Sequence, residues 1–168
     1  MTETILKMQK KVKRYLDKDR YDHTIGVMHT AGCLAMRYGA NLEQALTAGL
    51  LHDCAKCVPA DEKIKLCEKN HIEISDAEYK NPGLLHAKLG AFFAREKYGI
   101  ENEEILRSIE SHTTGRPNMS LLDKIIYIAD YIEPGRDVAP NLPEVRALAF
   151  VDIDACLYRI LEDTLAYL

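Results

Sequence analysis

The stretch Leu50-Leu51-His52-Asp53-Cys54-Ala55-Lys56 changes from apolar to polar in a single step. It ends an apolar helical run, so it places an imidazole and a carboxylate side by side at the edge of a hydrophobic core. Both groups are good ligands for a divalent metal, and the lysine can reach an anion bound to that metal. Two ligands are too few to hold a metal, so the others must come from elsewhere in the chain.

Length, composition and charge narrow the classes of protein. The 168 residues are 47% hydrophobic and 29% charged, which is the balance of one globular domain with a real core. The net charge of −4 argues against a protein that coats nucleic acid or a membrane surface, so we expect neither partner. Residues 1–13 lack the apolar stretch of a secretory signal, and the longest uncharged run, residues 24–36, is too short to span a bilayer.

The five cysteines are an odd number in a chain without a secretory signal, which favours a reducing, cytoplasmic setting over a disulfide framework. Cys54 and Cys57 have the C-x-x-C spacing of a redox pair or of half a zinc site. No second C-x-x-C and no βαβ pattern accompanies them. We therefore interpret the two cysteines as small, partly buried residues at a helix end and turn.

Hydrophobic periodicity indicates helices almost throughout the chain, and no stretch alternates convincingly as a strand. Asp22 is the expected cap of the second helix, which Gly39 ends, and Ser75 begins a helical turn. The sequence predicts one all-α domain of about eight or nine helices. These helices are expected at residues 4–16, 22–38, 42–53, 61–70, 84–98, 102–113 and 121–132, from residue 143, and at 152–168.

Four of the six histidines lie close to predicted helix ends or beside helix breakers. His23 opens a helix, His52 closes one, His86 follows the Asn-Pro-Gly break at residues 81–83, and His112 precedes a Gly-Pro loop. A lone histidine is more often structural than a ligand. Helix ends that converge can nevertheless place several ligands around one site, and four histidines in matching positions favour that interpretation.

The other two histidines do not join this group. His29 follows His23 by about 600° of helical rotation, so it points well away from it. His71 lies in a polar stretch and is expected to be exposed.

Asp130 follows the most apolar helical run of the C-terminal half, residues 125–129. A carboxylate in such a place is costly unless it is paired or bound to a metal. Asp123 is left out of the site because it can cap a helix or pair with Lys124. Glu133 is either a surface residue or a group that supports Asp130.

His23, His52, Asp53 and Asp130 thus form a candidate metal site of two imidazoles and two carboxylates. Such a mixed set suits iron, manganese, zinc, nickel or cobalt. Four protein ligands leave two positions of a six-coordinate ion open for water and a substrate oxygen. His86 and His112 either hold a second metal or bind the substrate directly.

The order of these residues resembles that of HD-domain metal-dependent phosphohydrolases. Three blocks are similar in more detail to the YqeK family: residues 20–27 (RYDHTIGV), residues 49–56 (GLLHDCAK) and residues 112–136 (from HTTG to YIEPGR). Members of that family are bacterial symmetrical bis(5′-nucleosyl)-tetraphosphatases, which split diadenosine tetraphosphate into two ADP. The resemblance extends from about Arg20 to the C-terminus, and its third block is the most specific.

The resemblance implies a single HD domain over residues 1–168, in which the helix at residues 4–16 packs on a metal-binding core at residues 20–136 and helices at 143–168 follow. It implies iron as the metal, with manganese, cobalt, nickel or zinc as alternatives, and attack of a metal-bound hydroxide on a phosphoanhydride. The implied metal ligands are His23, His52, Asp53 and Asp130, and His86 and His112 join them in catalysis. The implied phosphate contacts are Lys56, His86, His112, Thr113 and Arg136, and His23, Asp53 and Asp130 also face the substrate.

Two other functions are compatible with the same residues. One is another HD phosphohydrolase, acting on a nucleoside mono- or triphosphate or an alarmone, although the acidic pair that alarmone hydrolases place after the His-Asp pair is missing. The other is a non-catalytic sensor that binds ADP, which the complete ligand set disfavours. The expected partner is a dinucleoside polyphosphate or ADP, and a homodimer is left open.

Overall fold

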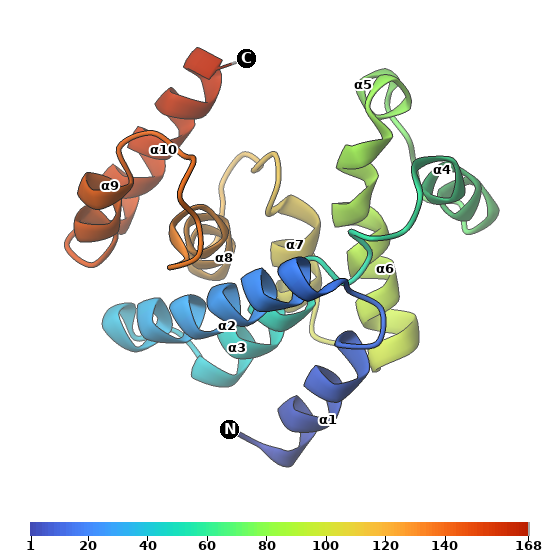
Figure 1. Cartoon of the computed structure of the whole chain (residues 1–168), viewed down its shortest axis with the longest axis horizontal. Coiled ribbons are helices and arrows are strands. Elements are labelled where there is room, and N and C mark those ends of the chain that lie inside the picture. Colours follow the sequence, from blue (N-terminus) through green and yellow to red (C-terminus); the bar gives the residue numbers. More distant parts are fainter. Residues whose placement is uncertain (168) are drawn as a thin grey trace.

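The computed structural model describes residues 1–167 and confirms the all-α prediction: those residues form ten α-helices and one short 3₁₀ helix, without a strand (Figure 1). The elements are α1 (Glu3–Val12), α2 (Lys18–Tyr38), α3 (Leu42–Leu51), α4 (Ala60–Lys69), α5 (Asp76–Lys80), η1 (Pro82–Leu85), α6 (His86–Tyr98), α7 (Glu103–Ser111), α8 (Leu121–Ile132), α9 (Leu142–Ala149) and α10 (Ile153–Tyr167).

Helices α2 and α3 form the central pair and lie side by side (Figure 1). Gly39 ends α2 in the left-handed conformation with φ of 70°, and the Asn41 side chain caps α3 by accepting from the Gln44 amide. A Cβ placed on Gly49 would lie 2.9 Å from the Cα of Met28. The two helix backbones therefore approach so closely that only glycine fits at residue 49 without movement.

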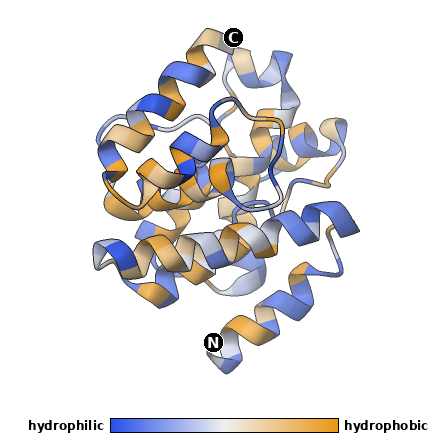
Figure 2. Ribbon diagram, turned by 60° about the vertical axis from the view of Figure 1, so that its left-hand side comes forward, coloured by the Kyte–Doolittle hydropathy of each residue, from blue (hydrophilic) through white to orange (hydrophobic). Residues whose placement is uncertain are grey.

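Helix α8 packs against α2 and α7 and also contacts α3, α9 and α10, so its apolar run becomes part of the core. Helices α4, α5 and α6 lie on one flank, α9 and α10 lie on the other, and α1 packs against α3 (Figure 1). Most helices carry both hydrophobic and hydrophilic residues, as amphipathic packing requires (Figure 2). No helix among residues 1–167 is long and apolar enough to cross a membrane.

The structure corrects the start of the second helix. Asp17, not Asp22, caps α2 and accepts from the Arg20 amide at 2.8 Å, whereas Asp22 lies inside the helix and pairs with Lys18. His23 therefore lies one turn inside α2 and does not open it. The helical turn predicted to begin at Ser75 is confirmed by α5, which Ser75 caps, and Ser120 and Asp152 cap the first turns of α8 and α10. The predicted end of the last helix, Leu168, lies outside the described residues.

Candidate metal centre

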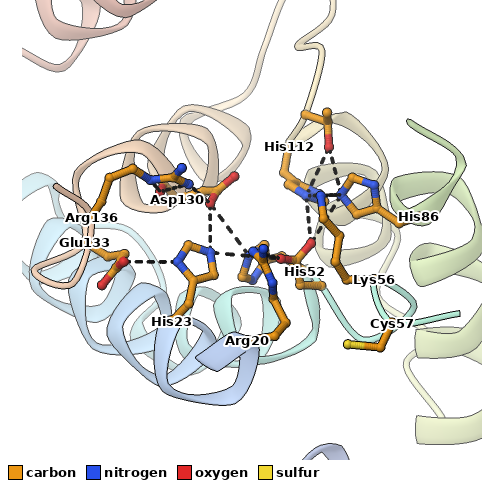
Figure 3. A network of polar contacts seen from close by, with 12 residues as sticks. Arg20, His23, His52, Lys56, Cys57, His86, His112, Asp130, Glu133 and Arg136 are labelled. Atoms are coloured by element: carbon orange, nitrogen blue, oxygen red, sulfur yellow. Dashed lines mark hydrogen bonds and ion pairs between the residues drawn. The ribbon is translucent and has the colours of Figure 1, made fainter. Parts of the chain in front are cut away.

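Five helical segments that are distant in sequence bring their polar side chains to one point (Figure 3). His23 comes from α2, and His52 and Asp53 come from the end of α3. The end of α7 contributes His112, and Asp130 comes from α8. The start of α6 adds His86, which directly follows the 3₁₀ helix, and Lys56 follows the His-Asp pair in the turn after α3.

Three of the four predicted ligands, His23, His52 and Asp130, form one group whose ligand atoms lie within 4.8 Å of one another, and Asp53 forms a second such group with His52 and His112. His23 Nε2 is 3.0 Å from Asp130 Oδ1 and 4.0 Å from Asp53 Oδ2. His52 Nε2 is 3.4 Å from Asp53 Oδ2 and 4.0 Å from Asp130 Oδ1. Ligand atoms bound at about 2.1 Å to one metal are about 3 Å apart when they subtend a right angle, so this spacing suits a common ion.

Three buried atoms of this group have no hydrogen-bond partner: His23 Nε2, His52 Nε2 and Asp53 Oδ1. Unpartnered buried polar atoms are costly in a folded protein and need an explanation. The opposite ring nitrogen of His52 donates to the Gly49 carbonyl at 2.7 Å, which leaves its Nε2 as a lone pair. Bare imidazole nitrogens beside carboxylates are the donor set of a divalent metal, and the residues therefore fit one.

His86 and His112 form a second cluster next to the first. Their Nε2 atoms are 3.1 Å apart, and they lie 3.2 Å and 3.5 Å from Asp53 Oδ1. The Thr113 hydroxyl is within 3.2 Å of both rings, and Lys56 Nζ is 3.3 Å from His86. The two Nε2 atoms and Asp53 Oδ1 are acceptors that lie close together in a buried place. A proton or a metal cation between them would stabilise this arrangement.

Two arginines border the metal ligands on the open side. Arg20 Nη1 is 2.8 Å from Asp53 Oδ2, and Arg136 Nη2 is 2.9 Å from Asp130 Oδ1. Both arginine side chains are about one third exposed, and both line a polar cavity of about 460 Å³ that opens onto His23. A larger cavity of about 590 Å³ lies between α2, α8 and α9, but it is mostly apolar and holds none of the proposed ligands.

The centre holds its carboxylates ionised. Burial alone raises the pKa of a carboxyl group, yet neighbouring imidazoles, His52 foremost, hold the pKa of Asp53 well below its ordinary value. The pKa of Asp130 is likewise lowered despite partial burial, mainly by the neighbouring His23 imidazole. Burial lowers the pKa of His86, whereas Asp53 overcomes burial and raises the pKa of His112. Two ionised carboxylates in a buried site are what a metal cation requires.

The structure brings together every predicted ligand and phosphate contact, including Thr113 and Arg136. His29 and His71 are exposed and stay outside, as expected. Arg20 was not among the predicted site residues, although it lies about one helical turn before His23 on the same helix. It also left Glu133 undecided, and this residue is buried and 3.1 Å from His23 Nδ1 (Figure 3).

The C-x-x-C pair has no sign of redox chemistry. Burial raises the pKa of the Cys54 thiol to about 12, and burial also raises the pKa of Cys57. A reactive cysteine needs the opposite shift. Both cysteines are free; Cys54 is buried, whereas Cys57 is exposed and not partly buried as expected.

Imidazoles and carboxylates that converge inside a helical bundle are typical of a metal-dependent enzyme. The sequence matches the HD domain family over residues 20–135, and the chain belongs to that family.

Its relatives agree with this assignment. The chain is 45% identical to a protein of Halalkalibacterium halodurans and 41% identical to one of Bacillus subtilis, both named symmetrical bis(5′-nucleosyl)-tetraphosphatase. Each match covers 94% of this chain and 83% of the relative. The crystal structure of a predicted HD superfamily hydrolase involved in NAD metabolism, from Clostridium acetobutylicum, is 43% identical with a TM-score of 0.92, and the match covers 96% of this chain and 85% of that one.

Proposed function

We propose that the chain hydrolyses diadenosine tetraphosphate symmetrically into two ADP. The observation that carries the proposal is the set of four converging donors flanked on both sides by cationic side chains, in a chain whose relatives bear the name of this activity. A tetraphosphate bridge carries several negative charges, so a substrate of this kind needs positive charge at more than one point along its length.

The proposed metal ligands are His23, His52, Asp53 and Asp130, and the expected metal is iron. A divalent metal supplies, when bound, charge neutralisation at the phosphates and a water of lowered pKa. The protein contributes the two ionised carboxylates and the two bare imidazole nitrogens. The cluster at His86 and His112 is the place where a second cation would be held, and metal content per chain measures the number of ions directly.

The proposed substrate contacts surround these ligands. Lys56 and the two histidines of the second cluster would bind the phosphates on one side, with the Thr113 hydroxyl as a further donor. Arg136, and also Arg20, would bind them on the other side, where their guanidinium groups face the open cavity. Arginine forks bind phosphate oxygens in pairs and so fix the orientation of the bridge as well as its charge.

A substrate panel tests the assignment against its alternatives. Metal-reconstituted protein is incubated separately with diadenosine tetraphosphate, NAD, ATP and AMP, and the nucleotides are separated by chromatography. We expect rapid loss of the tetraphosphate alone, with ADP as the nucleotide product. Preferred cleavage of NAD, ATP or AMP would assign the site to another nucleotide phosphohydrolase, and tight ADP binding without any turnover would make the chain a sensor.

A further inference from the structure

The four histidines of the site are held by two different means. His52, His86 and His112 each donate Nδ1–H to the carbonyl three residues earlier, at 2.7, 2.6 and 2.6 Å. Each of these residues directly follows a helix, α3, η1 or α7, whose last carbonyls have no helical partner and can accept from a side chain. Local structure thus fixes the tautomer of three of the four rings.

His23 has no such local partner. It lies inside α2, where backbone carbonyls already accept from amides four residues later. Its Nδ1 instead lies 3.1 Å from Oε1 of Glu133, a residue 110 positions away at the end of α8 (Figure 3). The buried Glu133 carboxylate therefore accepts from Nδ1 of His23, as a backbone carbonyl does for each of the other three histidines.

Glu133 is buried at the edge of the polar cavity, and its side chain is only 5% exposed. Its second oxygen accepts from the Gly135 amide at 2.7 Å. A Cβ on Gly26, on the α2 turn that follows His23, would lie 2.4 Å from Oε2 of Glu133. Real Cβ contacts are never so short, so glycine at residue 26 leaves the space that this carboxylate occupies.

The backbone that carries Glu133 is also braced. Arg146 of α9 donates to the carbonyls of Ile132, Glu133 and Arg136 at 2.9, 2.8 and 2.7 Å. Three hydrogen bonds from one guanidinium to one short segment hold its position. Helix α9, which supplies Arg146, provides no ligand to the centre. It nevertheless stabilises the segment that carries Glu133 through these three hydrogen bonds.

We propose that Glu133 is a positioning residue that keeps Nδ1 of His23 protonated and its Nε2 bare and aimed at the metal, and that Gly26 makes room for it. This proposal rests on the proposed metal site. A carboxylate behind a metal-bound histidine fixes the orientation of the ring and increases its basicity, and losing such a partner typically weakens metal binding by about tenfold to a hundredfold.

A double-mutant cycle between the two residues tests the inference by titrating metal-free protein with ferrous or manganous ion. Glu133→Ala weakens binding by about tenfold to a hundredfold. Gly26→Ala does the same in the wild-type background because its methyl group displaces the carboxylate. In the Glu133→Ala background the methyl group has nothing to displace, so Gly26→Ala causes no further loss of affinity.

The ring tautomer provides a readout that does not depend on metal or activity. In ¹⁵N spectra of metal-free protein, His23 has its proton on Nδ1, and Glu133→Ala shifts the proton toward Nε2. Asp123→Asn is the matched control, since Asp123 is a buried carboxylate of the same helix that touches no residue of the centre, and it leaves both readouts unchanged. Unchanged metal affinity and tautomer in Glu133→Ala would overturn the inference, whereas metal binding without tetraphosphate cleavage would overturn only the proposed function.

Discussion

Asp53 and Asp123 are both buried carboxylates, but only Asp53 belongs to the proposed metal centre. A comparison of variants at these two positions therefore distinguishes the effect of losing a buried charge from the effect of losing a metal ligand. The Asp53 and Asp123 side chains are 2% and 0% exposed. Each pairs with an arginine that is about one third exposed, Arg20 at 2.8 Å and Arg116 at 2.6 Å. Replacement of either aspartate by asparagine keeps the volume and removes the charge.

The two variants should lose similar stability without metal. Breaking a fully buried pair costs about 3–5 kcal/mol, and water around the arginine reduces this to about 2 kcal/mol. For a chain of this length, that loss lowers the Tm by about 4–8 °C. Scanning calorimetry of both metal-free variants measures it directly.

The two variants should differ once metal is added. Metal at one hundred times its Kd stabilises the folded state by about 2.7 kcal/mol, which raises the Tm by roughly 5–11 °C. Wild type and Asp123→Asn gain this increase, and Asp53→Asn gains none. Turnover falls by about 10³-fold or more in Asp53→Asn alone, because the several kcal/mol that a metal contributes to the transition state is lost. A metal-induced Tm increase in Asp53→Asn, or its loss in Asp123→Asn, would refute the assignment.

The remaining predictions concern the substrate contacts and the fold. Lys56→Met lowers kcat/KM for the tetraphosphate by about tenfold to a hundredfold, the value of one charge-assisted hydrogen bond, while calorimetric titration finds metal affinity unchanged. Gly49→Ala forces its methyl group against Met28, costs about 1–3 kcal/mol in chemical denaturation and weakens metal binding, because two ligand-bearing helices must separate. Lys88 Nζ lies 2.8 Å from a carboxylate oxygen of Glu78. Burial alone would raise the pKa of Glu78, but the lysine lowers it below the ordinary value of a glutamate. The ion pair therefore stabilises the fold above that ordinary pKa, and this contribution is lost as the pH falls through the lowered pKa. Glu78→Gln accordingly lowers the Tm by a few degrees at pH 7 and by less under acidic conditions, and an effect that does not shrink as the pH falls would contradict this.

The all-α fold could be predicted from the hydrophobic periodicity of the helices and from the glycine and proline residues that end them, because both are local properties of the chain. The predicted start of α2 was wrong because Asp17 and Asp22 are equally good N-cap residues when only the local sequence is considered. In the folded chain, Leu16 directly before Asp17 is buried in the core, and α2 begins immediately after these two residues. Local sequence does not report which residue tertiary packing will bury.

Part of the candidate site could be predicted because His52, Asp53 and Asp130 are polar or charged residues next to apolar helical runs. Burial of such side chains costs free energy unless they are paired or bind a metal. The roles of Arg20 and Glu133 were not predictable in the same way. A long charged side chain near a helix end is most often exposed. Its partner in this chain becomes evident only when α2, α3 and the end of α8 are placed together in space.

The most direct test of the central claim is hydrolysis of diadenosine tetraphosphate by metal-loaded protein in ¹⁸O-labelled water. Symmetrical cleavage breaks the central anhydride, so water enters one of the two product molecules. We expect ADP as the only nucleotide product, half of it carrying one ¹⁸O atom and half carrying none. AMP together with ATP, or turnover that survives complete removal of metal by a chelator, would contradict this expectation.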